Sequence, residues 1–283
     1  MEAPGSEGTV RALETTAREI RRDIVRMTHA AGSGHPGGSL SVCDLVNALV
    51  FQELRLDPTR PDWPERDRLV LSKGHAAPAL YSALALRGYF PRDELLTLRK
   101  LGSRLQGHVD RNKLPFIEAS TGGLGQGIGM AVGMALAARL GPHHYRTVVI
   151  IGDGECQAGS TWEALMAGGH YRLSNLLVIL DRNGYETDGP TESIMGIEPI
   201  ADKLRAFRYH TIEIPGHDYP EILRAFDEAR QVTTGPTAIV AHTVKGKGVS
   251  FMEGSHTYHG RAPTSAELER ALAELGAPGE AGR

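Results

Sequence analysis

The chain has 283 residues, of which 41% are hydrophobic, so it is long enough for a large α/β domain with a substantial core, and no domain boundary is visible. Its formal net charge of -3, without a basic arm or a patch of basic and aromatic residues, disfavours nucleic-acid binding. The amino terminus lacks the plan of a signal peptide and no apolar run approaches the roughly 20 residues of a membrane span, so we expect a soluble cytoplasmic protein.

Helices and strands are predicted to alternate along the first half of the chain. Apolar residues recur at helical spacing over 10–29, and Gly32 is expected to end this helix. A second helix is predicted to begin near Ser39, which has the side chain of a helix cap. Residues 68–71 have the pattern of a first strand, and a helix through 79–84 follows it.

The same alternation continues to about residue 241. The expected elements are helix 125–140, strand 147–151, helix 159–170, strand 176–180, helix 200–207, strand 211–214, helix 219–232 and strand 237–241. This order predicts an α/β fold, a doubly wound and mainly parallel sheet with helices on both faces. We expect residues 1–283 to form a single domain with a frayed tail from about residue 276.

Polar and glycine residues follow two of the predicted strands. The run 152–155, Gly-Asp-Gly-Glu, comes after strand 147–151, and Asn183 comes after strand 176–180. Because a helix joins them, the strands should be parallel and end at the same edge of the sheet, where open α/β sheets bind ligands. Oxygens of Asp153 and Asn183 could then bind a magnesium ion that bridges a diphosphate. Gly-Asp-Gly and Asn-Gly are also ordinary turn sequences, so this pair alone leaves both interpretations open.

Six segments in a fixed order favour a metal and diphosphate site over ordinary turns. Gly-Asp-Gly-Glu followed after thirty positions by Asn-Gly resembles the thiamin diphosphate motif, and the flanking sequence resembles the transketolase family, in particular the separate amino-terminal subunit of split transketolases. The other five segments are 33–38, 72–76, 101–108, 121–127, and 244–251 with the His259-Gly260 pair. The resemblance implies the thiamin diphosphate-binding fold and the transfer of a two-carbon ketol unit from a ketose, expected to be phosphorylated, to an aldehyde.

The resemblance also implies roles for particular residues. The expected catalytic residues are His35, His75, His108 and His259. The expected metal ligands are Asp153, Asn183 and the backbone carbonyl of Tyr185, with Mg²⁺, or Ca²⁺ or Mn²⁺ in its place. The residues expected to bind thiamin diphosphate are His75, Gly122, Leu124, Gly152, Asp153, Gly154, Glu155, Asn183 and His259.

Other reactive side chains are given simpler interpretations. Cys43 lies in an apolar helix pattern and is expected to fill the core, and Cys156 has no histidine placed by sequence to activate it. Lys245 and Lys247 are interpreted as solvated loop charges. No role is assigned to the eight other histidines, which are His29, His143, His144, His170, His210, His217, His242 and His256.

The resemblance implies a partner subunit, and the sequence departs from the family's pattern at one position. The family's pyrimidine-binding domain, which carries the glutamate that activates the cofactor, is expected on a separate chain, and we expect an α2β2 assembly that is active only when complete. At the place of Ala158 the family commonly has a glutamate that helps to link active sites across the dimer, which puts such communication in doubt here.

Two alternatives remain from the sequence. The chain could belong to another thiamin diphosphate enzyme, such as a 2-oxoacid dehydrogenase component or a deoxyxylulose-phosphate-type synthase, or it could be a degenerate, non-catalytic subunit.

Overall fold

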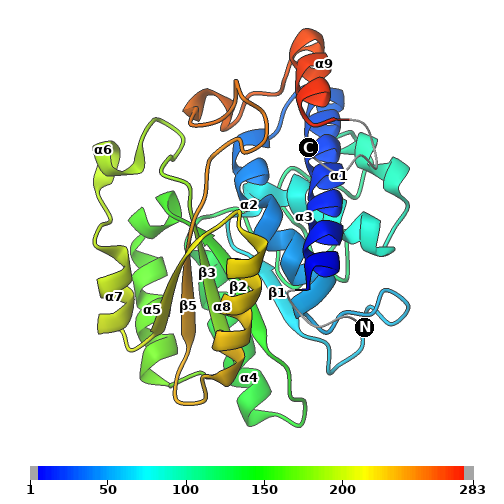
Figure 1. Ribbon diagram of the computed structural model, residues 1–283. Coiled ribbons are helices and arrows are strands. Elements are labelled where there is room, and N and C mark those ends of the chain that lie inside the picture. Colours follow the sequence, from blue (N-terminus) through cyan, green and yellow to red (C-terminus); the bar gives the residue numbers. More distant parts are fainter. Residues whose placement is uncertain (1–5, 277–283) are drawn as a thin grey trace.

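A five-stranded parallel sheet forms the centre of the protein. The computed structural model describes residues 6–276, and its strands lie in the order β1-β2-β3-β5-β4 (Figure 1). They are β1 (Arg68–Leu71), β2 (Thr147–Gly152), β3 (Leu176–Arg182), β4 (His210–Pro215) and β5 (Thr237–His242). All four neighbouring pairs are parallel, as the alternation of helices and strands predicts.

Helices cover both faces of the sheet, which confirms the predicted α/β fold (Figure 1). One layer contains α1 (Glu7–Ala31), α2 (Pro36–Ala48), α3 (Ala77–Arg87) and α8 (Tyr219–Gln231). The other contains α4 (Gln126–Leu140), α5 (Gly159–His170) and α7 (Ile200–Ala206). Two short helices are α6 (Thr191–Met195) and α9 (Ser265–Glu274), and single turns lie at Leu49–Glu53, Gly74–Ala76, Arg92–Thr97, Gly154–Gln157 and His256–Tyr258.

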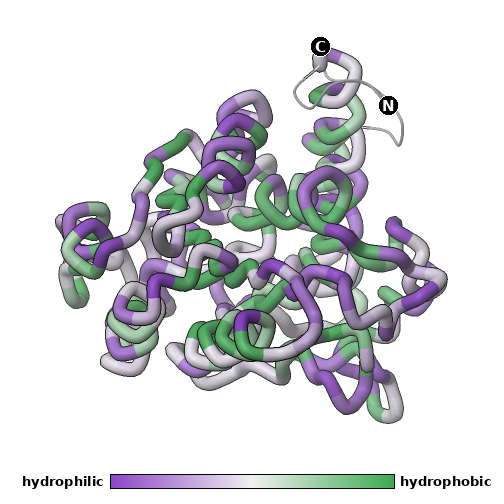
Figure 2. Tube along the Cα trace, turned by 90° about the horizontal axis from the view of Figure 1, so that it is seen from below, coloured by the Kyte–Doolittle hydropathy of each residue, from purple (hydrophilic) through white to green (hydrophobic). Residues whose placement is uncertain are grey.

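Four strands, β1, β2, β3 and β5, contribute to two hydrophobic cores, whereas the edge strand β4 contributes Ile212 and Ile214 to one of them. On β2, Val148 and Ile150 pack with the α1, α2, α3 and α8 layer, whereas Val149 and Ile151 pack with the α4, α5 and α7 layer. Successive side chains of a strand point to opposite faces, so a sheet buried on both faces needs an uninterrupted apolar run. In Figure 2, hydrophobic segments gather in the interior of the molecule and hydrophilic segments lie around its periphery.

Most predicted boundaries agree with the structure within a few residues, but the predicted cap of the second helix, Ser39, is wrong. Helix α2 begins at Pro36, and the hydroxyl of Ser39 donates a 2.7 Å hydrogen bond to the carbonyl of His35 inside the first turn. The fixed φ of proline suits the first helical position, and this effect outweighs the capping propensity of Ser39. Helix α1 does end at Gly32, which has a left-handed φ of 63°.

Two helices were not predicted. Helix α9 has a capping box in which Thr264 and Glu267 bond reciprocally, a signal that the sequence does contain. The short helix α6 has no side-chain cap. The expected frayed tail lies almost entirely outside the described residues, and within residues 6–276 no helix is long and apolar enough to cross a membrane.

Candidate active site at the carboxyl ends of the strands

The two halves of the Gly-Asp-Gly and Asn-Gly pattern meet at the carboxyl ends of β2 and β3. Gly152 pairs in register with Asp181, so the loops that follow the two strands leave the sheet side by side. Oδ2 of Asp153 accepts a 2.6 Å hydrogen bond from the backbone N–H of Gly184. The strand–helix–strand prediction is therefore confirmed in its geometry.

The three predicted metal ligands surround this junction. Asp153 is 1% exposed, and burial followed by the nearby charge of Asp181 raises the pKa of its carboxyl. Oδ1 of Asn183 accepts from the backbone N–H of Tyr185 at 3.1 Å, which orients the amide oxygen toward that residue. A carboxylate, an amide and a main-chain carbonyl form the all-oxygen donor set that Mg²⁺ prefers.

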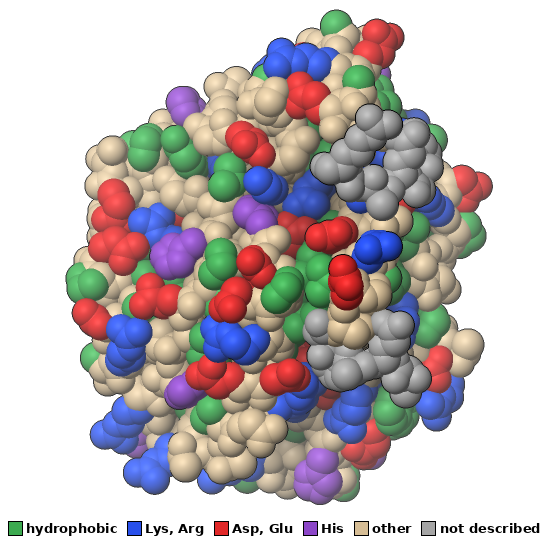
Figure 3. Space-filling model, in the orientation of Figure 1, with side chains coloured by type: hydrophobic (Ala, Val, Ile, Leu, Met, Phe, Trp, Pro, Cys, Tyr) green, Lys and Arg blue, Asp and Glu red, His purple; other side chains and the backbone are tan. Residues whose placement is uncertain are grey.

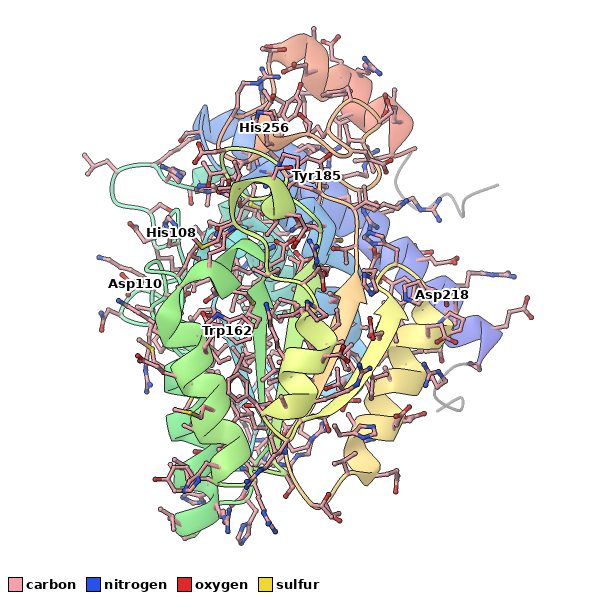
Figure 4. The ribbon with its side chains drawn as sticks, turned by 90° about the vertical axis from the view of Figure 1, so that its left-hand side faces the viewer. His108, Asp110, Trp162, Tyr185, Asp218 and His256 are labelled. Carbon is pink, nitrogen blue, oxygen red and sulfur yellow. The ribbon has the colours of Figure 1, made fainter. Side chains whose placement is uncertain are left out.

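Four histidines from distant segments come together at the same end of the sheet. The ring of His35, just before α2, lies 5.4 Å from that of His75, 5.6 Å from that of His108 and 5.5 Å from that of His259. His75 and His259 are 5.0 Å apart. Figure 4 shows His108 and Tyr185 on loops at this end of the molecule. The structure thus brings together all four histidines that the sequence motifs contain.

The cluster has an unused polar atom at its centre. Nδ1 of His35 is buried and has no hydrogen-bond partner among residues 6–276. A buried polar atom without a partner carries a cost of about 1–3 kcal/mol, so such an atom in a native structure points to a missing ligand or water. The cluster is suited to a polar molecule that completes its hydrogen bonds.

The histidines are held in their neutral form. The pKa of His35 is lowered to about 4 by burial and then by the charges of His108 and Arg99, and the pKa of His259 to about 3 by burial and then by Lys245. Burial and then Lys73 lower the pKa of His75 well below its ordinary value, and burial and then Arg99 lower the pKa of His108. Neutral imidazoles have one donor and one acceptor nitrogen, and can therefore both donate and accept hydrogen bonds.

Lys245 is buried, so its interpretation as a solvated loop charge is wrong. It is 1% exposed, and its ammonium donates to the carbonyl of Glu186 at 2.9 Å and of Tyr185 at 3.3 Å. The ammonium also donates a 2.9 Å hydrogen bond to Nδ1 of His259, which must be the acceptor because an ammonium can only donate. Lys245 therefore joins the metal-ligand loop to the histidine cluster. Lys247, two residues later, is partly exposed beside Glu253, as expected of a loop charge.

A buried ion pair supports the floor of the site. The ammonium of Lys73 contacts Oδ2 of Asp181, and the hydroxyls of Ser41 and Thr243 donate to the same carboxylate. The side-chain amide of Asn183 also lies 3.3 Å from Oδ2 of Asp181. Asp181 thus fixes the orientation of the Asn183 amide from behind.

The other predicted cofactor residues fall into two groups. The carboxylate of Glu155 points inward and accepts from the backbone N–H of Gly125 at 2.8 Å, from that of Gly152 at 3.2 Å, and from Ser72. Gly122 and Leu124 are exposed; a Cβ on Gly122 would lie 3.8 Å from the ring of His108. Glu155 therefore organises the loop from within, whereas Gly122 lies next to the cluster and both Gly122 and Leu124 are exposed.

The two cysteines behave as expected. Cys43 is fully buried in the core. Cys156 is 2% exposed, and burial followed by the charges of Glu155 and Asp153 raises the pKa of its thiol well above the ordinary value, which opposes the formation of a thiolate. No group of three or more His, Cys, Asp or Glu side chains able to hold a metal ion occurs in residues 6–276, so His256 and His259 do not form a zinc site with a third such residue there.

A cavity of about 1250 Å³ lies elsewhere, between α1 and the start of α8, and includes none of the predicted site residues.

The charges on the face shown in Figure 3 are mixed in sign, without a broad basic area.

Comparison with known proteins covers nearly the whole chain. Residues 12–281 match the family model described as transketolase, thiamine diphosphate binding domain. The chain is 45% identical to the 6-deoxy-6-sulfo-D-fructose transketolase subunit SqwG of Clostridium sp. (strain MSTE9), over 93% of this chain and 96% of that protein. It is 40% identical to a subunit of the apulose-4-phosphate transketolase of Phocaeicola vulgatus, over 94% of each chain.

The solved structures agree with the sequence relatives. Transketolase from Leishmania mexicana superimposes with a TM-score of 0.89 at 33% identity, and the match covers 95% of this chain but 42% of that one. The two subunits are matched over nearly their full length, whereas the solved transketolase extends well beyond the matched region.

Proposed function

This chain belongs to the transketolase family, as the amino-terminal subunit of a two-component, thiamin diphosphate-dependent transketolase. We propose that its four clustered histidines line the part of the active site in which the ketol unit is transferred. The observation that carries this proposal is the convergence of four histidines, with ring separations of 5.0–5.6 Å, beside Asp153 and Asn183. The alternatives of another thiamin diphosphate class or a degenerate subunit are not favoured by these relatives.

We propose that Asp153, Asn183 and the carbonyl of Tyr185 hold a divalent cation, Mg²⁺ or Ca²⁺ or Mn²⁺ in its place. The oxygen donor set supports this assignment. The further cofactor contacts would come from His75, Gly122, Leu124 and His259. Thiamin diphosphate, when bound, supplies the electron sink for cleavage of the sugar chain.

The histidines have separate tasks in this proposal. His35 and His108 face the sugar, where neutral imidazoles accept a hydroxyl proton or donate to an oxygen that gains negative charge. His259 accepts from Lys245 at Nδ1, so its Nε2 carries the proton. This Nε2 is directed to a neighbouring hydroxyl, 3.3 Å away on Thr187, and is available as a donor. His75 stays neutral beside Lys73 and contacts the diphosphate region.

The substrate is proposed to be a ketose with an anionic end. The two named relatives act on a sulfonated and on a phosphorylated sugar according to their names. Arg99 and His108 line the same hollow, and the charge of Arg99 lowers the pKa of both His35 and His108. A Cβ on Gly107 would lie 2.9 Å from Nη1 of Arg99, so the glycine makes room for this guanidinium.

The rest of the enzyme is proposed to come from a partner subunit. Residues 1–283 are proposed to form a single diphosphate-binding domain, and the pyrimidine domain to lie on the partner chain, in an α2β2 assembly. The match to 42% of a solved transketolase chain supports this division. Native mass measurement of the complex purified from its own cells tests it: a second chain of the family supports the proposal, and a self-associated chain alone refutes it.

The histidine proposal is tested by His35→Ala in the reconstituted complex. We expect kcat/KM for ketol transfer to fall by about 100-fold or more, because the variant loses a general acid–base group, with thiamin diphosphate affinity little changed. His256→Ala is the control, since His256 is an exposed histidine outside the cluster. Unchanged kcat/KM in His35→Ala, or an equal loss in His256→Ala, would refute the assignment. Turnover of a 2-oxoacid rather than a ketose would refute the reaction class.

A further inference from the structure

Arg182 occupies an unusual place beside the proposed metal ligands. It is the last residue of β3, and its side chain is 11% exposed. Each arm of its guanidinium contacts a different carboxylate: Nη1 lies 3.0 Å from Asp153, Nη2 lies 3.2 Å from Glu192, and Nε lies 2.9 Å from Glu198. One cation is therefore shared by three acids, one of which is a proposed metal ligand.

The two oxygens of Asp153 differ in their surroundings. Oδ2 accepts from Arg182, from the backbone N–H of Gly184 at 2.6 Å and from the hydroxyl of Thr191 at 3.2 Å. Oδ1 accepts only the backbone N–H of Gly154, at 2.8 Å, among residues 6–276. The lone pairs of Oδ2 are used within the protein, whereas Oδ1 keeps room for another partner.

The two other acids connect Arg182 to the segment 185–199, which includes α6. Glu192 also accepts from the backbone N–H of Ile197 at 3.1 Å, and Glu198 accepts from that of Ile200 at 2.7 Å. Figure 1 shows α6 projecting away from the sheet at the level of the strand ends. Arg182 thus ties this projecting segment to the carboxylate that would bind the metal.

We propose that Arg182 is a positioning residue that holds the place of a cation at Asp153, so that a divalent metal binds there only together with the oxygens of a diphosphate. The guanidinium partly neutralises the three carboxylates before the metal arrives and leaves Oδ1 as the oxygen of Asp153 with room for another partner. This inference rests on the proposed role of Asp153, Asn183 and Tyr185 as metal ligands.

Electrostatics gives the direction of the effect. Without Arg182, three carboxylates would lie close together with no cation between them, which strongly favours a divalent ion. In a partly buried site, one unit charge a few Å from a divalent ion changes its affinity by about tenfold or more. If Arg182 acted only as a structural support, its loss would instead loosen segment 185–199 and weaken the binding of metal.

The test measures Mn²⁺ binding by electron paramagnetic resonance, on the complex with its partner subunit after removal of metal and cofactor. In the absence of thiamin diphosphate, we expect weak binding by the wild type and about tenfold tighter binding by Arg182→Gln. Arg182→Lys keeps the charge and should stay within about threefold of the wild type. Arg205→Gln is the matched control, because Arg205 also bridges two acids but contacts Asp202 and Glu213 on the surface.

Equal or weaker Mn²⁺ binding by Arg182→Gln than by the wild type would overturn the inference. Should Arg182→Gln fail to fold, Glu198→Gln serves in its place: it removes one acid, keeps an oxygen for Ile200, and is expected to weaken Mn²⁺ binding. Unchanged or tighter binding in that variant would overturn the inference equally. The proposed metal site is judged separately, by wild-type Mn²⁺ binding with thiamin diphosphate present; if that binding is absent or survives in Asp153→Asn, the site itself is refuted.

Discussion

Lys245 shows at the scale of one residue how a buried ammonium can connect two parts of a site. Burial and then Lys73 lower its pKa to about 8, so the charged form is lost as the pH rises through that value. We expect Lys245→Met to reduce kcat of the reconstituted enzyme by about tenfold or more, because His259 and two carbonyls lose their donor. The wild-type pH profile should fall above about pH 8. Lys247→Gln is the control; equal losses in both variants would contradict a specific role for Lys245.

The same residue shows why some site residues could be predicted from the sequence and others could not. The histidines and Asp153 stand in glycine-containing motifs, so their chemistry is visible in the residue types themselves. Lysine in a glycine-containing loop usually points to solvent, and the sequence does not reveal that this loop folds over the carbonyls of Tyr185 and Glu186. Arg182 could not be identified for a related reason, since its three acids are 10 to 29 positions distant in the sequence.

At the scale of elements, Asp44 on α2 links several segments of the α/β layers. It accepts from Arg21 on α1, from Nδ1 of His217 at 2.7 Å and from Tyr219 at 3.0 Å. Burial alone would raise the pKa of Asp44, but Arg21 and then His217 lower it to about 2. We expect Asp44→Ala to reduce the free energy of unfolding by about 3–5 kcal/mol, because Arg21 would remain buried without its anion.

Urea denaturation of the chain measures this loss. The matched control is Asp202→Ala, which breaks an exposed ion pair with Arg205 on α7 and should leave stability unchanged within error. A loss in Asp44→Ala no larger than that of the control would contradict the prediction. The network also bears on the site, since Nε2 of His217 accepts the backbone N–H of Val244, next to Lys245.

The elements themselves could largely be predicted, because each carries its own periodicity. Strands such as β2 and β3 are uninterrupted apolar runs, and that pattern is decisive for a sheet buried on both faces. The order β3-β5-β4 could not be predicted, because it depends on which faces the helices cover rather than on any local signal. The start of α2 was misplaced because Pro36 and Ser39 are both favourable near a helix start, and the fixed φ of Pro36 outweighs the capping propensity of Ser39.

At the scale of the whole molecule, the neutral histidine cluster makes stability depend on pH. The pKa values of His35 and His259 are lowered from 6.5 to about 4 and about 3, so the unfolded chain binds protons first as the pH falls. Their contribution should be complete above about pH 6.5 and decline toward pH 4. After allowance for solvent, we expect a loss on the order of 1 kcal/mol per pH unit.

Urea unfolding at several pH values between about pH 7.5 and about pH 4.5 measures that slope. This range lies above the pH at which carboxylates such as Asp44, with a pKa of about 2, lose their contribution to stability. The double variant His35→Gln with His259→Gln should reduce the slope, because two of the four histidines whose protonation opposes folding have been removed. His256→Gln, at an exposed position, should keep the wild-type slope. If the double variant retains that slope, the acid sensitivity originates elsewhere, and the fold does not hold His35 and His259 neutral.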